Sequence, residues 1–259
     1  MPPDKAALLA ASGFFLAGFV HAVRSLSRRS QQGHWTGTAL LLAGFLCQCL
    51  FLAWRGRELG RCPITTPFEL LTFVSWAMVL LHFVTGTAYR LSLLGAFTAP
   101  LALVLQLTAL LRYLPAHPAG RTRPGFWPEM HATLSLIAYG AFALACVAGV
   151  LFLIQDRLLK GHRNMNLVRH LPAIHHLSSA VHRLILAGTL ILSTGIIAAY
   201  QMPSRPPAAK LAFVWGIWGI YTAILAYDRW RGMSARRSAW AAAIGFLFPV
   251  LSLWIVARR

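Results

Sequence analysis

Apolar residues gather in eight long runs that are separated by shorter polar stretches. The runs lie near residues 6–23, 36–54, 68–87, 92–111, 131–154, 183–200, 211–227 and 239–256. Most are close to the length of about 20 residues at which an α-helix crosses the hydrocarbon core of a bilayer. The pattern therefore predicts an all-α, polytopic integral membrane protein with about eight transmembrane helices.

The connections between these runs are short. The third and fourth runs are joined by a few residues around Arg90, which indicates a tight helical hairpin. Residues 112–130 are rich in proline and glycine, and residues 155–182 carry several histidines. Neither is long enough for a separate soluble domain, so residues 1–259 are expected to form a single transmembrane domain. The first run has no small-residue cleavage site after it, and we interpret it as a retained helix.

Composition supports this interpretation. The 259 residues are 58% hydrophobic and 12% charged, with a mean hydropathy of +0.62, which leaves too little charge to cover a soluble domain. Basic residues outnumber acidic ones by 24 to 6. Such an excess is typical of membrane proteins, whose short loops anchor helices to anionic headgroups. A nucleic-acid partner is not expected, because no soluble stretch offers a basic face; the lipid bilayer is the expected surrounding.

Basic residues favour one orientation weakly. If the N-terminus lies outside, the inner loops hold 13 of the 24 lysines and arginines. Cytoplasmic loops usually carry the excess of lysine and arginine, so we expect both termini to lie outside the cytoplasm. The expected location of the protein is the cell (inner) membrane.

His131 stands out among the residues that could carry chemistry. It is the first residue of the fifth run and follows Trp127 by four residues. In the favoured orientation it lies at the outer face of the cell membrane. A neutral imidazole can bind haem iron, and nearby aromatic rings can pack on a porphyrin. The alternative is an interfacial histidine that bonds to headgroups or to a loop. Trp215 and Trp218 share a face of the seventh run and could also pack on a porphyrin, or serve as interfacial anchors.

Other polar residues have simpler interpretations. His21 and His82 lie near the inner ends of the first and third runs, where ionisable groups are candidates for function, including a haem held between helices. Glu69 follows Thr66 and Pro67 in the pattern of a capping box, so we expect it mainly to cap a helix. A further group of histidines falls in the connection 155–182, with no standard zinc spacing: His162, His170, His175, His176 and His182.

Enzymatic signatures are absent from the sequence. It contains no phosphate-cradling glycine loop, no GxSxG elbow and no HExxH motif, and its six acids form no plausible catalytic pair. The four cysteines include no CxxC pair. These absences set aside several classes of enzyme.

The order of the segments resembles the cytochrome c assembly family of CcsA/CcmC-type haem-handling membrane proteins, and within it the short HemX-like and YpjD-like branch. The resemblance spans almost the whole chain. It is carried by PFELLTFVSWAMVLLHF (67–83), LGAFTAPLALVLQL (94–107), MHATLSLIAYGAFALACVAGVLFLIQDRLLK (130–160), LPAIHHLSSAVHRLILAGTLILSTGIIA (171–198) and RWRGMSARRSAWAAAIGF (229–246).

This resemblance implies a haem platform on the outer face, where histidines on either side of a tryptophan-rich WWD segment hold the iron. Haem is then presented to apocytochrome c, together with other cytochrome c maturation proteins. His131 matches the first of those histidines. The WWD segment is missing between the sixth and seventh runs, although Lys210 stands where its lysine is expected, and Tyr227 replaces the second histidine. The chain is therefore expected to bind or guide haem or a partner without catalysing a bond change itself. The alternative is a permease-like or regulatory membrane subunit that kept the fold and lost the haem site.

Overall fold

Long α-helices make up the protein. The computed structural model describes residues 2–28, 34–89, 94–113, 125–161, 174–203 and 208–257, and all regular secondary structure in these ranges is helical. The helices are α1 (Pro3–Arg28), α2 (His34–Leu59), α3 (Pro67–Tyr89), α4 (Leu94–Leu111), α5 (Phe126–Lys160), α7 (Ile174–Tyr200), α8 (Ala208–Arg231), α9 (Ala235–Gly245) and α10 (Leu247–Ala257). The prediction of an all-α membrane protein is confirmed.

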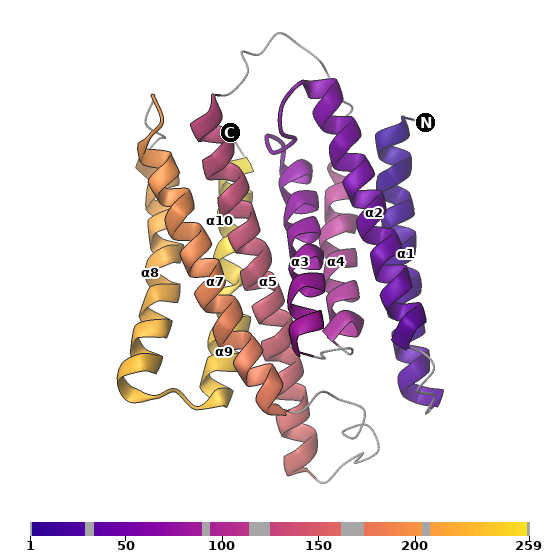
Figure 1. Cartoon of the computed structure of the whole chain (residues 1–259), viewed down its shortest axis with the longest axis vertical. Coiled ribbons are helices and arrows are strands. Elements are labelled where there is room, and N and C mark those ends of the chain that lie inside the picture. Colours follow the sequence, from indigo (N-terminus) through magenta and orange to yellow (C-terminus); the bar gives the residue numbers. More distant parts are fainter. Residues whose placement is uncertain are drawn as a thin grey trace.

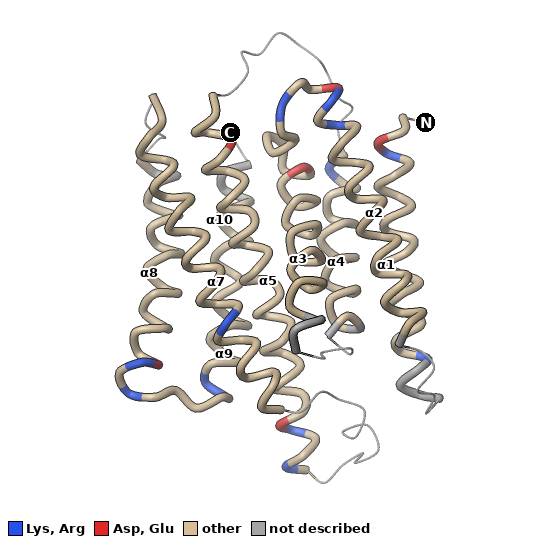
Figure 2. Tube along the Cα trace, in the orientation of Figure 1, with Lys and Arg blue, Asp and Glu red and all other residues tan. Residues whose placement is uncertain are grey.

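The helices run alternately up and down in one bundle (Figure 1). At the end that we call the upper end, α1 begins, α2 leads to α3 through residues 60–66, α5 begins, α7 ends and α10 ends. At the lower end, α1 and α3 end, α5 ends, α7 begins, and residues 232–234 join α8 to α9. Lys, Arg, Asp and Glu lie mostly at these two ends, as a bilayer around the middle of the bundle requires (Figure 2).

Among the described residues, six helices are long and apolar enough to cross a bilayer, namely α1, α2, α3, α5, α7 and α8. The protein is therefore a multi-pass membrane protein. The helix α4 contains a shorter apolar stretch, Phe97–Leu111. Every run that the hydropathy pattern predicted coincides with helical structure, while the number of eight membrane crossings stays a prediction.

Most helices extend beyond the predicted runs by several residues, and the largest shift is at the start of α7. The helix α7 begins at Ile174, nine residues before the predicted run, so His175, His176 and His182 are helical rather than part of a loop. His162 and His170 lie outside the described residues. The polar first turns of α7 hid its start, because they lower the hydropathy without disfavouring a helix.

The last predicted run is not one helix. It divides into α9 and α10 at Phe246. Pro249 explains the break: it has no N–H to donate to the carbonyl of Gly245, and its ring crowds that carbonyl. The chain resumes its helical hydrogen bonds where Val250 donates to the carbonyl of Phe246 at 3.3 Å.

The helix α5 lies at the centre, between α3, α7 and α9 (Figure 1). Small residues allow these close contacts. A Cβ added to Gly140 would lie 2.7 Å from the Cβ of Ala77 in α3, and one added to Gly149 would lie 2.7 Å from the carbonyl oxygen of Ala239 in α9. The helices α3 and α4 contact α5 from one side, and α7 and α9 contact it from the other; α1 and α2 pack against α3 and α4, and α8 packs against α7 and α9. The upper part of α5 is thus held in place from both sides.

Candidate functional site

The helix α5 begins at the upper end with residues that favour a helix start. Pro128 lies in its first turn, where the missing N–H is not needed. Glu129 follows in the same turn, where a carboxylate is stabilised by the positive end of the helix dipole. These residues fix the start of α5 and, with it, the position of His131.

His131 is held by a hydrogen bond between helices. Its Nδ1 lies 2.8 Å from the carbonyl oxygen of Gly195 in α7. Because a carbonyl oxygen only accepts hydrogen bonds, Nδ1 must carry the proton. In the neutral ring, Nε2 then keeps a free lone pair, and no further hydrogen bond of this ring occurs within the described parts of the chain. Histidines that bind metals commonly use this arrangement, with one nitrogen bonded to a carbonyl and the other directed to the metal.

Trp127 lies on the same side of α5 as His131, because residues four positions apart share a helix face. Its side chain is 41% exposed, and its ring contacts Phe126 edge to face at 5.3 Å between centroids. The indole of Trp127 is only about one helical turn away from a flat apolar ligand bound at His131. The structure therefore brings together these two of the predicted site residues.

The tryptophans of α8 lie elsewhere. Nε1 of Trp218 donates to Oγ of Ser193 in α7 at 2.8 Å, and Nε1 of Trp215 donates to the hydroxyl of Tyr200 at 3.2 Å. Ser193 and Gly195 are two positions apart, which is about 200° around a helix. The hydrogen-bonding partners of His131 and Trp218 are therefore on different sides of α7.

The two other candidate histidines lie toward the lower end. Oγ1 of Thr36 in α2 is 2.5 Å from Nε2 of His21. His82 is buried in α3 beside Phe83, and its Nδ1 has no hydrogen-bond partner among the described residues. No contact in the described structure joins the two rings, so neither extends the site around His131. Tyr227 is exposed near the lower end of α8. The side chain of Lys210 lies outside the described residues.

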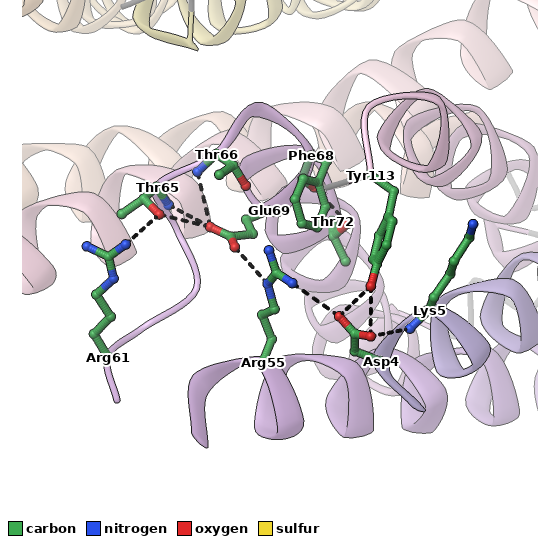
Figure 3. A network of polar contacts seen from close by, with 10 residues as sticks. All are labelled: Asp4, Lys5, Arg55, Arg61, Thr65, Thr66, Phe68, Glu69, Thr72 and Tyr113. Atoms are coloured by element: carbon green, nitrogen blue, oxygen red, sulfur yellow. Dashed lines mark hydrogen bonds and ion pairs between the residues drawn. The ribbon is translucent and has the colours of Figure 1, made fainter. Parts of the chain in front are cut away.

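A buried cluster of charges at the upper end was not predicted (Figure 3). Arg55 in α2 donates from Nε to Oε1 of Glu69 in α3 at 2.9 Å and from Nη1 to Oδ2 of Asp4 in α1 at 3.2 Å. Its guanidinium carbon also lies 4.9 Å from the ring centre of Phe68. Arg55 and both carboxylates are no more than 2% exposed. We call Asp4, Arg55, Glu69 and Tyr113 the charge cluster.

Tyr113 completes the charge cluster. Its hydroxyl lies 2.9 and 3.0 Å from the two carboxylate oxygens of Asp4. Burial, followed by the hydrogen bond to Asp4, raises the pKa of Tyr113 to about 12, so it remains a donor at neutral pH. The cluster thus joins α1, α2 and α3 to Tyr113, two residues past the end of α4.

Glu69 acts both as a cap and as an ion partner. Its Oε2 accepts hydrogen bonds from the backbone N–H groups of Thr65 and Thr66 at 3.0 and 3.1 Å, and Pro67 begins α3, as the capping box predicts. Its Oε1 accepts from Arg55. Thr66 itself contributes no cap, since its hydroxyl has no partner among the described residues. The expectation that Glu69 is mainly a cap is therefore too narrow.

Two further groups extend this polar region. Below the charge cluster, Nε2 of Gln48 donates to Oγ of Ser75 at 2.9 Å and to Oε1 of Gln106 at 2.8 Å. Beside it, the backbone N–H of Cys62 donates to Oε1 of Glu129 at 3.4 Å. Burial raises the pKa of the Cys62 thiol, which keeps it protonated. The 60–66 connection thereby joins the charge cluster to the start of α5, two residues from His131.

One sequence signal could have revealed the charge cluster. Its three charged members lie at the start of the first run, the end of the second and the start of the third. In a bundle that alternates up and down, these positions share one end of the membrane. Acids are rare in this chain, so two of them at the same end as an arginine next to an apolar run indicate an ion pair.

Together, the long apolar helices and the buried polar groups define a multi-pass membrane protein whose upper end is built around fixed charges and a metal-competent histidine. The sequence profile of the cytochrome c assembly protein family matches residues 65–258. The chain belongs to this family.

Relatives with curated names agree with this assignment. Protein HemX of Brevibacillus brevis is 27% identical over 187 residues, which are 71% of this chain and 65% of HemX. The cytochrome c biogenesis proteins CcsA of Nostoc punctiforme and Synechococcus elongatus are 28% and 30% identical over 126 residues. These matches cover 47% of this chain and 35% and 38% of the two CcsA proteins. The chain thus spans just under two thirds of HemX and little more than a third of CcsA.

Proposed function

We propose that the protein takes part in cytochrome c maturation by binding or guiding haem at its upper end, with His131 as the axial ligand of the iron. Haem would be the cargo of the pathway, and the protein would hold it without making or breaking a covalent bond. Membership in the cytochrome c assembly protein family supports this role. The single observation that carries it is the hydrogen bond from Nδ1 of His131 to the carbonyl oxygen of Gly195, which leaves Nε2 available for a metal.

The residues around His131 fit one side of a haem. Trp127, one turn earlier on the same face of α5, is available for packing on a porphyrin. No partner on the opposite side is evident among the described residues: Tyr227, which stands where a second histidine is expected, lies near the lower end. Binding should therefore be weak, with the sixth position of the iron open to water or to added imidazole.

The upper end is proposed to face the outside of the cell membrane, because the loops at the lower end hold the larger share of basic residues. Apocytochrome c and other maturation proteins would then meet the haem on that side. The two CcsA proteins are named for cytochrome c biogenesis, which supports partners of this kind.

The absorbance of haem tests this proposal. The purified, haem-loaded protein should show a Soret band, His131→Ala should remove it, and free imidazole should restore part of it. His21→Ala and His82→Ala are matched controls and should keep the band, because both histidines lie toward the other end. A wild-type protein without a Soret band after expression with ample haem would contradict the proposal. It would favour instead a permease-like or regulatory subunit that kept the fold.

A further inference from the structure

A polar pocket opens at the lower end, far from His131. Its volume is about 340 Å³, within the range of about 300–1,000 Å³ that is usual for small-ligand sites. Three helices and one connection form its walls: α7, α8, α9 and residues 232–234. The lining residues are Ser178, Ser179, His182, Arg183, Asp228, Met233 and Ser238. We call this the lower pocket.

The walls of the lower pocket are fixed by one carboxylate. Oδ2 of Asp228 lies 2.9 Å from Nδ1 of His182, and Oδ1 accepts the backbone N–H of Met233 at 2.7 Å. Both oxygens therefore have partners within the wall, and they join α8 to α7 and to the connection that leads to α9. A carboxylate in these contacts stabilises the pocket.

The remaining lining groups suit an anion. Arg183 contributes a guanidinium, and Ser178 and Ser179 contribute hydroxyl groups, whereas the hydroxyl of Ser238 donates to the carbonyl of Ser234 at 3.5 Å. Arginine with hydroxyl donors is a common combination for binding phosphate. The hydroxyls of Ser178 and Ser179 form no hydrogen bond with other described residues, so they are available as donors.

The surroundings of the lower pocket are also basic. Arg229 and Arg231 end α8, and Arg236 and Arg237 begin α9, all of them exposed. Figure 2 shows these basic segments at the lower ends of both helices. The other acid at this end, Asp156, is bonded to Lys160 at 2.9 Å and lies 3.8 Å from Arg236. The field around the pocket is therefore positive and attracts anions.

Aromatic residues place the lower pocket at the level of lipid headgroups. Tyr227, Trp230 and Trp240 are exposed on α8 and α9 beside it, and Trp230 is 92% exposed. Exposed tyrosine and tryptophan at the ends of membrane helices mark the boundary between hydrocarbon and headgroups. Basic pockets between such helices are known to bind anionic headgroups.

We propose that the lower pocket is a binding site for the phosphate group of an anionic membrane phospholipid. Arg183 and the hydroxyls of Ser178 and Ser179 bind the phosphate, and the positive charge of Arg183 and of the surrounding arginines favours a headgroup with net negative charge. The acyl chains lie along the exposed apolar surface of α8. A free phosphate ion shares the same chemistry, and the experiment separates the two sources.

Native mass spectrometry of the full-length protein in neutral detergent tests the proposal. Phosphatidylglycerol should be retained roughly tenfold more tightly than phosphatidylcholine, the effect expected of one charge-assisted contact. Arg183→Gln should remove most of this preference. Arg57→Gln, which removes an exposed arginine of the upper end, should leave it unchanged. Ser178→Asp, which places a negative charge in the pocket, provides a second test if Arg183→Gln does not fold.

Three results would overturn the proposal. Equal retention of the two lipids would do so, as would an equal loss of preference in Arg57→Gln, which would show a diffuse attraction to the whole surface. The third is displacement of phosphatidylglycerol from the wild type by inorganic phosphate at a concentration equal to that of the lipid. This result would identify free phosphate as the ligand. Competition by phosphate only at a much higher concentration would support a lipid site.

Discussion

Arg55 is among the largest side chains that are fully buried in the protein, and its guanidinium lies between two carboxylates. In a low-dielectric interior, an ion pair does not stabilise a fold merely by existing, because removing the charges from water costs several kcal/mol for each ion. Breaking such a pair is nevertheless severe, since the remaining charge keeps its desolvation cost. The charge cluster should therefore be highly sensitive to the loss of any one member.

Arg55→Met should lower the free energy of unfolding by about 3–5 kcal/mol, because it leaves Asp4 and Glu69 buried without their cation. Thermal denaturation in detergent measures the change. Arg57→Gln, two residues further along the same helix and exposed, should remain within about 0.5 kcal/mol of the wild type. Equal stability of the two variants would show that the cluster is hydrated rather than buried.

Glu69→Gln separates the two roles of this residue. The amide oxygen can still accept the N–H groups of Thr65 and Thr66, so a pure cap would tolerate the change. The amide nitrogen, however, then faces the guanidinium of Arg55, and two donors cannot bond. We expect a loss larger than the roughly 1 kcal/mol of a missing cap, measured in the same denaturation assay. Wild-type stability of this variant would restore the simpler interpretation.

At this scale, the sequence predicted the cap and missed the ion pair. A capping box is local: Thr66, Pro67 and Glu69 are neighbours along the chain, and their pattern is sufficient to predict the bond. Arg55 and Asp4 are 51 positions apart, and the residues next to each of them along the chain do not indicate which partner it contacts. The same limit applies to His131, whose partner Gly195 lies 64 positions away.

At the scale of elements, hydropathy predicted where helices run but not how they pack. In a bilayer, the faces toward lipid and toward other helices are both apolar, so amphipathic periodicity loses its power to show which face is buried. Glycine positions supply the missing information only once the structure is known. Gly140 and Gly149 lie against neighbouring backbones, whereas a Cβ on Gly216 would have open space around it.

Gly140→Ala should destabilise the protein by about 1–3 kcal/mol, because the new Cβ would lie within 2.9 Å of the backbone of Ala77 and Met78, which cannot yield like a flexible side chain. Gly216→Ala is the matched control within a helix. It meets no neighbour and should be neutral or slightly stabilising, since alanine favours helices more than glycine does. Apparent melting temperatures in one detergent compare the two. A neutral Gly140→Ala would mean that α3 and α5 are less tightly packed.

At the scale of the whole molecule, alternation of the helices places each described helix end at the upper or the lower end of the bundle. The upper end holds the charge cluster, Cys62 and His131, and the lower end holds the lower pocket and most of the exposed arginines of α8 and α9. The charge count along the sequence favours the lower end as the cytoplasmic one by a small margin. Two candidate sites thus face opposite sides of the membrane.

Reporter fusions test this orientation. A reporter joined after Gly161, at the lower end of α5, should be active in the cytoplasm. One joined after Gln201, past the upper end of α7, should report the outside. The reverse result would invert the orientation, and it would move the proposed haem site to the cytoplasmic side. The same side for both would contradict the crossing of the membrane by α7.

The contacts of the charge cluster also form in a definite order during synthesis of the protein. Asp4 leaves the ribosome first, whereas its partners Arg55 and Tyr113 follow 51 and 109 positions later. Until α2 has entered the membrane, the carboxylate of α1 has no cation, and until α4 is complete it lacks the phenol. The last contact of this carboxylate therefore forms only after the fourth helix is made, although the carboxylate itself belongs to the first.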